Sequence, residues 1–350
     1  MITTVRLGQR AIGRGYPCFI IAEAGVNHNG NLGKAMQMID AAVQAGADAV
    51  KFQTFQTDAI VTRSAPKADY QLKHSPRLES HYDMLKRLEL SAQAHHDLAQ
   101  YCKRKGILFL SSALDEASSD LLEKIGVEAF KVPSSEITNL PFLEHLARKG
   151  RLMILSTGMS DLKEIRTAVE TILNTRHCEL ILLHCVSNHP VEPAESNLLA
   201  MKTMASELNL PIGFSDHALG IEISLAAVAL GACVIEKHFT LSRNLPGPDQ
   251  KASLEPKELQ ALVRGIRTVE RSLGNGRKEP AKSESHMADV MRKSLVAAIN
   301  LPAGTKIARE HLVCKRPGTG LPPSRREEVI GRTVTRNVRA GSILKWNMFR

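Results

Sequence analysis

Short apolar runs alternate with amphipathic stretches between residues 19 and 239, and most of these runs end in a polar or ionisable side chain. The runs lie at 19–25, 49–54, 107–113, 129–135, 152–157, 180–186, 212–217 and 234–239. Continuous apolar strands that alternate with helices are typical of a parallel sheet buried on both faces. Eight such units favour a closed (β/α)8 TIM barrel, with an open doubly wound sheet as the alternative.

The polar ends of these runs predict where a site forms, because the carboxyl ends of barrel strands meet at one mouth. Several of the side chains at these ends can bind anions, transfer protons or hold a metal ion. They are Glu23, Lys51, Gln53, Ser112, Lys131, Ser134, Ser156, His184, Ser215, His217, Glu236 and His238. A polar rim of this kind on an apolar barrel indicates an enzyme.

The sequence pattern changes after residue 275, from long helical periodicity to short strand-like pieces. Before that point, apolar residues from Leu259 to Leu273 recur with the spacing of one helix face and predict the last helix of the barrel. A polar, turn-rich stretch follows, and beyond it short strand-like pieces (KSLVAAIN, TKIAREHLVCKRP, SILKWNM) alternate with turns. We therefore expect a barrel over residues 1–275, a linker over 276–288 and a small strand-rich domain over 289–350.

The formal net charge of +10 is unevenly distributed, because residues 281–350 carry 14 Lys and Arg against 5 Asp and Glu. A basic segment attached to a nearly neutral body attracts nucleic acid, an acidic partner or a phosphorylated substrate. Nucleic acid is not expected, because the segment has no helix-turn-helix, RNA-binding or zinc-finger spacing.

The cysteines and the apolar runs predict a cellular location. The six cysteines show no CxxC spacing and several lie in apolar runs, as expected of reduced thiols in the cytoplasm. The first residues lack a basic-then-apolar leader, and the longest apolar run is too short to cross a bilayer. Membrane insertion is not expected.

Two histidines end consecutive predicted strands, His217 and His238. In a barrel they would be neighbours at the mouth, where they could share a divalent ion or form a hydrogen-bonded polar pocket. Two protein ligands leave positions for water and substrate, which suits exchangeable Mn²⁺ or Mg²⁺ better than a structural zinc. By strand parity Glu236 shares a face with His238 and would orient it, whereas Asp216 points to the other face.

Two lysines, Lys51 and Lys131, end the second and fourth strands among several serines. Together they form an expected cradle for an anion, with lysine as a point charge and hydroxyls as short donors. A lysine deep in a barrel can instead form a Schiff base with a carbonyl substrate, so a lysine-dependent aldolase is an alternative. Glu23 is either a general base, a ligand of a substrate hydroxyl or a charge partner. His184 is equally consistent with a core histidine bonded to backbone.

Eleven sequence blocks occur in order along nearly the whole chain. They are IIAEAGVNHNGNL, AVKFQTF, APKADYQ, MLKRLEL, FKVPSSEITNLPFL, ILSTGM, LLHCVSNHPVEP, GFSDHALG, IEKHFTL, GPDQKASLEP and KRPGTG. These blocks resemble the sialic acid synthase family, whose members join phosphoenolpyruvate to an N-acylmannosamine-type aldehyde. The resemblance implies a TIM barrel followed by a small antifreeze-like domain, also called the SAF domain.

The resemblance also implies roles for individual residues. His217 and His238 would be the metal ligands, and Glu23 the acid or base. The residues placed around phosphoenolpyruvate are Lys51, Ser112, Lys131, Ser134, Ser156, Ser187 and Ser215, and those facing the aminosugar are Glu23, Gln53, His189 and Asp249. Arg316 is similar to an arginine that reaches from the small domain of one subunit into the barrel mouth of the other, which implies a homodimer.

Three stretches depart from the family pattern. SSALD replaces STPFD, so Ser112 stands for a threonine and Leu114 for an aromatic residue; His189 stands for a tyrosine, and Ser135 for a glycine. We expect the phosphate cradle to persist and the sugar pocket to differ. A 2,4-diacetamido-6-deoxy sugar, the precursor of legionaminic acid, therefore competes with N-acetylmannosamine as the substrate. GIEISLAAVALGACVIEKHFTL and ASLEPKEL are similar to legionaminate-type members.

The reaction that the resemblance implies is a condensation. C3 of phosphoenolpyruvate attacks the aldehyde carbon of the open-chain aminosugar, water adds at C2, and phosphate leaves by C–O cleavage. A metal ion would polarise the aldehyde. Two alternatives remain at this point: an aldolase that uses Lys131 covalently, and a non-catalytic carbohydrate- or ice-binding role of the basic domain, which leaves the polar barrel rim without a purpose.

Overall fold

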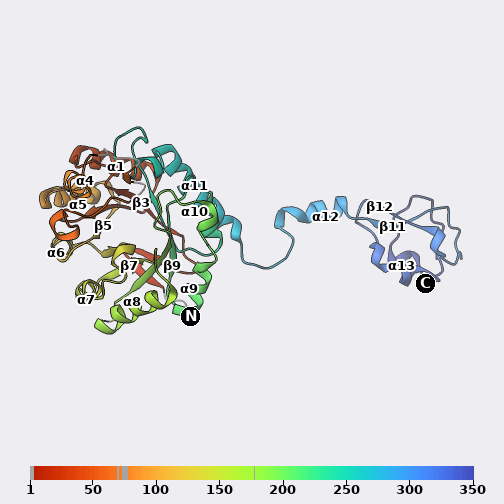
Figure 1. Ribbon diagram of the computed structural model, residues 1–350. Helices are drawn as coiled ribbons and strands as arrows, with labels where there is room; N and C mark the ends of the chain where they lie inside the picture. The colour runs from red at the N-terminus through yellow and green to blue at the C-terminus, as the bar shows by residue number, and fades with distance from the viewer. Residues whose placement is uncertain (1–3, 69–70, 73–77, 177) are drawn as a thin grey trace. The chain divides into compact units, whose positions relative to one another are not determined.

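A closed barrel of eight parallel strands forms the first part of the protein (Figure 1). The computed structural model describes residues 4–68, 71–72, 78–176 and 178–350. The barrel strands are β3 (Phe19–Gly25), β4 (Ala49–Thr54), β5 (Leu108–Ala113), β6 (Ala129–Val132), β7 (Leu152–Ser156), β8 (Leu180–Cys185), β9 (Ile212–Asp216) and β10 (Val234–His238). Because β10 pairs with β3, the sheet has no edge, which confirms the TIM barrel and excludes the open sheet.

Each barrel strand lies within one of the eight predicted apolar runs. β3 and β4 begin and end where their runs do. The run at 129–135 was expected to form one strand, but β6 ends at Val132 because Pro133 has no N–H to donate. A single turn of 3₁₀-helix, η1 (Ser134–Glu136), follows and places Ser134 at the barrel mouth.

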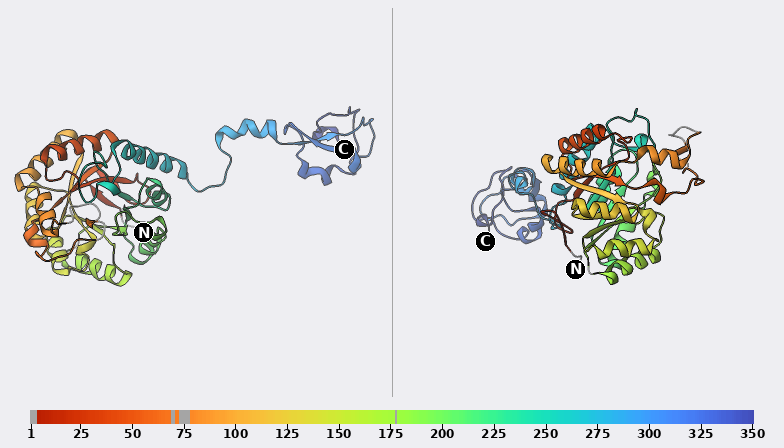
Figure 2. Two further views of the ribbon diagram at one scale, coloured as in Figure 1. Left: turned by 45° about the horizontal axis from the view of Figure 1, so that its top comes forward. Right: turned by 90° about the vertical axis from the view of Figure 1, so that its left-hand side faces the viewer.

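Helices surround the strands, as Figure 2 shows most clearly. They are α1 (Leu32–Ala45), α5 (Ala92–Lys105), α6 (Glu116–Ile125), α7 (Leu140–Arg148), α8 (Leu162–Thr175), α9 (Ala200–Leu208), α10 (Glu222–Ala229) and α11 (Pro256–Leu273). Side-chain caps begin many of them: Asn31 accepts from the Lys34 N–H, and Asp161 forms a capping box with Glu164. Gly46 ends α1 in the left-handed conformation that glycine adopts at least cost.

Alternation along the strands builds two separate cores. In β3, Ile20, Ala22 and Ala24 pack outward with the helices, whereas Phe19 and Ile21 belong to an apolar cluster inside the barrel. The same parity turns Glu23 into the barrel interior. A short hairpin, β1 (Val5–Leu7) and β2 (Arg10–Ile12), adds apolar side chains to the inner cluster, although the sequence pattern did not predict it. The apolar end of the barrel is thus filled, and the polar end stays open.

The described part of the connection from β4 to α5 includes the short helices α2 (Thr57–Ile60) and α4 (His81–Leu88). Met84 and Leu88 of α4 form a small apolar cluster with Val26 and Phe55, and Leu114 packs against it. Asp69 and Tyr70 of the APKADYQ block lie outside the described residues.

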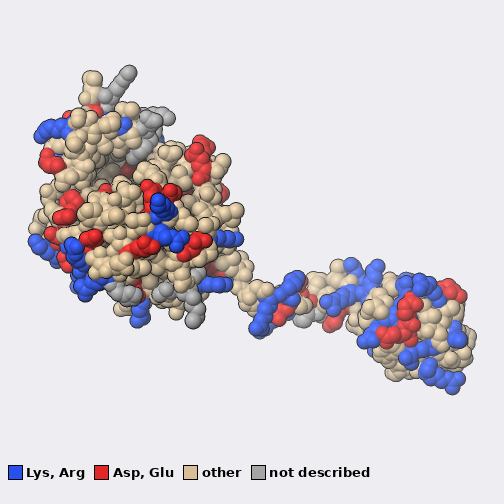
Figure 3. All heavy atoms as spheres, turned by 60° about the horizontal axis from the view of Figure 1, so that its bottom comes forward, with Lys and Arg blue, Asp and Glu red and all other residues tan. Residues whose placement is uncertain are grey.

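The chain divides into two compact units, Met1–Gly274 and Asn275–Arg350. The second has its own apolar core and one antiparallel pair, β11 (Ser294–Ala297) with β12 (Leu312–Lys315). The strand-like piece SILKWNM forms no regular strand; Ile343 joins Val296 by an isolated bridge. Helices α12 (Ser285–Met291) and α13 (Arg326–Val329) complete the unit. Basic side chains and a smaller group of acidic ones both appear on the face of this unit seen in Figure 3.

None of the helices in the described part of the chain is long and apolar enough to cross a membrane. The six cysteines are unpaired thiols, and five of them are buried. Burial raises the pKa of Cys102 and of Cys233 to about 12, so both remain protonated and inert.

Candidate active site

A cavity of about 280 Å³ opens at the carboxyl ends of the barrel strands. All the barrel residues predicted to bind or react line it: Glu23, Lys51, Gln53, Ser112, Lys131, Ser134, Ser156, Ser187, His189, Ser215, His217, His238 and Asp249. A larger hollow of about 770 Å³ lies beside the β1–β2 hairpin at the other end of the barrel and contains none of these side chains. Arg316 lies in the second unit, where its Nε donates to the Met291 carbonyl at 3.1 Å.

Lys51 sits between two buried carboxylates. Its Nζ lies 2.8 Å from Glu23 Oε2 and 3.7 Å from Glu236 Oε2, and it donates to Ser112 Oγ at 2.9 Å. Strand register explains the closest pair, because Glu23 of β3 lies opposite Lys51 of β4. A cation so held offers a fixed positive charge to an anionic substrate.

Glu236 joins the second lysine to the same network. Its Oε1 lies 3.5 Å from Lys131 Nζ and accepts a hydrogen bond from Ser215 Oγ at 3.0 Å. Lys131 also donates to Ser156 Oγ at 2.8 Å. Strand parity predicted only that Glu236 orients His238, whereas the structure places its carboxylate between two lysines. The alternation of side chains along the strand predicts that Glu236 points into the barrel. The sequence does not show which side chains contact it there.

The network separates the proton affinities of its members. Burial raises the pKa of Glu23 to about 7, although Lys51 opposes the shift. Burial acts to raise the pKa of Glu236 as well, but the positive charges of Lys131 and Lys51 outweigh this effect. The pKa of Glu236 is therefore lowered. Burial lowers the pKa of Lys131, against the opposing effect of Glu236. Of these two carboxyls, Glu23 has the pKa nearer neutrality, as suits a general acid or base.

Serine hydroxyls and one backbone N–H gather beside Lys131. The N–H of Gly158 donates to Ser134 Oγ at 2.9 Å. A Cβ atom on Gly158 would lie 2.3 Å from Ser187 Oγ and 3.0 Å from Ser134 Oγ, so only glycine lets these hydroxyls approach. Hydroxyls next to a buried lysine form a cradle for a phosphate or carboxylate. The block ILSTGM contained Gly158, but the sequence did not single it out.

A second glycine, Gly25, keeps space free on the opposite wall. Its φ is +51°, and a Cβ atom there would lie 3.2 Å from Glu23 Oε1 and 3.5 Å from both Gln53 Nε2 and His238 Cε1. Glycine tolerates this left-handed conformation without steric cost. The Glu23 carboxyl and the edge of the His238 ring therefore remain open to the cavity.

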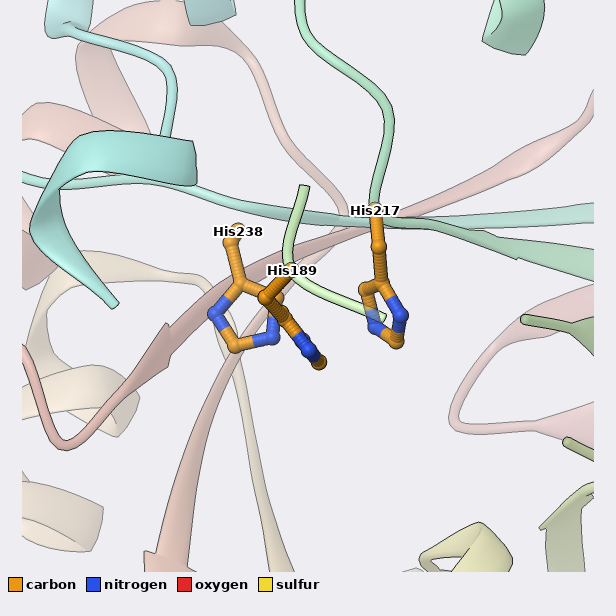
Figure 4. Close-up of side chains that lie close together, drawn as sticks. All are labelled: His189, His217 and His238. Atoms are coloured by element: carbon orange, nitrogen blue, oxygen red, sulfur yellow. The ribbon is translucent and has the colours of Figure 1, made fainter. Parts of the chain in front are cut away.

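Three imidazoles meet on one side of the cavity, from the end of β9 (His217), the end of β10 (His238) and the loop after β8 (His189), as Figure 4 shows. One ring nitrogen of each lies within 4.8 Å of the others. His217 Nδ1 donates to the Val186 carbonyl at 2.7 Å, which leaves Nε2 as the electron-pair donor. His238 Nδ1 is buried and makes no hydrogen bond to the described residues.

Two of these rings have the protonation state that metal ligation requires. Burial lowers the pKa of His189 and of His238 well below the usual value, so both are neutral and can donate an electron pair. Burial acts to lower the pKa of the third, His217, but Cys185 and the Val186 carbonyl together raise it. Cys185, not predicted from the sequence, also lines the cavity, and its Sγ lies 3.8 Å from His217 Nδ1. The residues present fit a divalent ion.

Other predicted positions lie on the remaining walls or outside the cavity. Burial raises the pKa of Asp249 to about 6. Leu114 lines the cavity with Val26 and Met84 and makes that wall apolar. His184 lies outside the lining, where its ring bonds the Ser196 carbonyl at 2.9 Å.

Comparison with known proteins identifies the two units. Residues 38–278 match the NeuB family, and residues 292–350 match the SAF domain. The chain is 46% identical to the N,N'-diacetyllegionaminic acid synthase of Legionella pneumophila over 97% of this chain and 96% of that enzyme. The enzyme of the same name from Campylobacter jejuni is 45% identical over 93% of this chain and 98% of its own.

A solved structure gives the same result for the fold. The crystal structure of N-acetylneuraminic acid (sialic acid) synthetase from Leptospira borgpetersenii, in complex with citrate, is 39% identical and superposes with a TM-score of 0.72. The match covers 82% of this chain and 95% of that one.

Proposed function

The chain belongs to the NeuB family, and we propose that it condenses phosphoenolpyruvate with an acylated aminosugar, releasing phosphate and forming a nonulosonic acid. One observation carries this assignment: two buried lysines, a cluster of hydroxyls, a carboxyl with a pKa near 7 and three imidazoles line a single cavity. The lysines and hydroxyls suit a dianionic substrate, and the imidazole side suits a polarised aldehyde.

Phosphoenolpyruvate binds through Lys51, Lys131 and the hydroxyls around Gly158. With C3 held against the aldehyde, its electron pair forms the new C–C bond and the carbonyl oxygen takes the proton of Glu23. Water then adds to the cationic C2 and returns a proton to Glu23. The C2 hydroxyl then passes its proton to the leaving phosphate oxygen, and the C2–O bond to phosphate breaks as the keto group forms. Glu23 acts first as acid and then as base, which its pKa of about 7 allows.

A divalent ion, Mn²⁺ or Mg²⁺, held by His217 and His238 would supply Lewis acidity to the aldehyde oxygen. Chelation should then abolish phosphate release, and added Mn²⁺ or Mg²⁺ should restore it. Full activity of a His217→Ala, His238→Ala enzyme in chelator would refute the metal requirement.

For the sugar, we propose 2,4-diacetamido-2,4,6-trideoxymannose over N-acetylmannosamine, so that the product is N,N'-diacetyllegionaminate. The apolar wall made by Val26, Met84, Leu88 and Leu114 supports this choice, because a 6-deoxy sugar presents a methyl group where N-acetylmannosamine presents a hydroxyl. The 46% and 45% identity to two legionaminate-type enzymes supports it as well.

The test is kcat/KM for the two sugars at saturating phosphoenolpyruvate, read as phosphate release. A pocket that distinguishes a methyl from a hydroxyl typically changes specificity by about 10- to 200-fold. Leu114→Tyr, which introduces an aromatic ring with a hydroxyl, should move the preference toward N-acetylmannosamine. A clear preference of the unmodified enzyme for N-acetylmannosamine would instead assign a plain sialic acid synthase.

We further propose a homodimer in which Arg316 of one subunit completes the barrel site of the other. Arg316→Ala mixed with Glu23→Ala should regain activity after subunit exchange, because one hybrid site then carries both side chains. No recovery despite demonstrated exchange would place the whole site in one chain. The unpaired, buried cysteines fit a cytoplasmic enzyme.

The Schiff-base aldolase has less support. Lys131 is ion-paired with Glu236 and hydrogen-bonded to Ser156, which holds its Nζ beside an anion rather than open to a carbonyl. Borohydride in the presence of a carbonyl substrate should therefore leave no adduct on Lys131. A non-catalytic carbohydrate- or ice-binding role of the second unit also has less support, because it leaves the polar barrel cavity without a function.

A further inference from the structure

His189 stands out in the imidazole cluster because it lies within the loop after β8, whereas His238 ends β10 and His217 directly follows β9. We propose that His189 is a third protein ligand of the divalent ion, and that it makes the site prefer Mn²⁺ to Mg²⁺. The inference rests on the proposed function for the presence of an ion, and concerns which side chains hold it.

The backbone fixes the His189 loop to His217 at both ends. Before the loop turns, the Val186 carbonyl accepts from His217 Nδ1 at 2.7 Å; after it, the Val191 N–H donates to the His217 carbonyl at 3.1 Å. An isolated parallel bridge between Val191 and Ala218 extends this contact. His189 Nδ1 lies 3.2 Å from the Ser187 carbonyl, which orients the ring. His189 and His217 are thus held as one preorganised pair, as a metal site requires.

The ring positions permit simultaneous ligation. The His189 centroid lies 3.8 Å from that of His217 and 5.1 Å from that of His238, and the His217 and His238 centroids are 5.4 Å apart. Ligand nitrogens about 2.1 Å from one ion are roughly 3 to 3.5 Å apart. One nitrogen of each ring already lies within 4.8 Å of the others, so the side chains must rotate to bring all three nitrogens onto one ion.

The chemistry of the three ligands sets the selectivity. Among the described residues, the cluster of possible ligand atoms consists of three imidazole nitrogens and includes no carboxylate oxygen. Mg²⁺ prefers oxygen ligands and gives up water reluctantly, whereas imidazole suits transition-metal ions. Three imidazoles also leave further positions on a six-coordinate ion for water and a substrate oxygen.

The experiment uses the full-length protein, stripped of metal and titrated with Mn²⁺ and separately with Mg²⁺. Pulsed EPR of the Mn²⁺ form counts coordinated nitrogens, and calorimetry gives Kd for each ion. The variants are His189→Tyr, which keeps an aromatic ring, and His189→Gln; His286→Gln, on the exposed side of α12, is the control. Circular dichroism and thermal unfolding establish that each variant is folded.

We expect three coordinated nitrogens in the unmodified protein and in His286→Gln, and two in both His189 variants. The Kd for Mn²⁺ should rise at least about 10-fold in the His189 variants, while the Kd for Mg²⁺ changes much less. Two nitrogens in the unmodified protein, or an unchanged ratio of the two Kd values in His189→Tyr, would overturn the inference. Failure of the proposed function would be a different result: no phosphate release by the Mn²⁺-loaded unmodified enzyme with any aminosugar tested.

Discussion

Replacing Gly158 by alanine tests the phosphate cradle with a single methyl group. Gly158 is not among the residues with positive φ, so alanine meets no backbone strain there. The new Cβ would lie 2.3 Å from Ser187 Oγ and 3.0 Å from Ser134 Oγ, both closer than van der Waals contact. The two hydroxyls must therefore turn or shift away from the positions that face the substrate.

The expected loss follows from the hydrogen bonds that these hydroxyls donate. A hydrogen bond to a charged group contributes about 1.5 to 3 kcal/mol. Loss of one such bond to the phosphate raises KM for phosphoenolpyruvate roughly 10- to 150-fold, and loss of both raises it further. Inserting a methyl group into a packed site also costs about 1 to 3 kcal/mol of stability, which lowers Tm.

Steady-state phosphate release with varied phosphoenolpyruvate gives KM, and Gly33→Ala, at an exposed glycine in the first turn of α1, controls for the change itself. Adding Ser187→Ala to Gly158→Ala removes the atom at 2.3 Å and should restore Tm without restoring KM. A KM for Gly158→Ala within about twofold of the unmodified enzyme would show that these hydroxyls do not hold phosphate.

Three further predictions concern single buried groups. Glu23→Gln should lower kcat by about 10²- to 10⁴-fold because no proton can be exchanged, while circular dichroism stays unchanged; a kcat within tenfold of normal would contradict the acid–base role. Asp216→Asn should cost about 3 to 5 kcal/mol in urea unfolding, because Lys237 Nζ, 2.9 Å from Asp216 Oδ2, loses its buried counter-ion; an unchanged midpoint would refute this. Burial and His95 lower the pKa of His28 from 6.5 to about 4 in the folded protein. Between pH 4 and pH 6.5 the unfolded chain therefore binds more protons than the folded protein does. Stability should fall by roughly 3 kcal/mol as pH drops from 6.5 to 4, and His28→Asn should remove that part of the slope.

Strand-end chemistry explains how much of the cavity was predictable. The side chains at the ends of the apolar runs, together with the family resemblance, gave the barrel residues that line the cavity, because parallel strands bring equivalent ends to one rim. Gly158 and Cys185 were not singled out. Their roles depend on which atoms approach them, and spacing along the chain does not encode those distances.

The β1–β2 hairpin and the strands of the second unit were harder to predict from the sequence. The β1–β2 hairpin has strands of three residues, too short to show a period, yet its apolar side chains join the core inside the barrel. In the second unit, SILKWNM alternates like a strand but pairs through an isolated bridge at Ile343. In such a small domain, loop geometry outweighs local propensity.

The sequence alone determined the alternation of eight buried strands with amphipathic helices, because burial on both faces requires continuous apolar runs and helices require a 3.6-residue period. The tertiary structure decided the pairings. Closing β10 against β3 brings Glu236 near Lys51, and the fixed loop after β8 brings His189 to His217. Ion pairing and metal ligation depend on separations of a few ångströms between residues far apart in the chain, and only the closed barrel sets those separations.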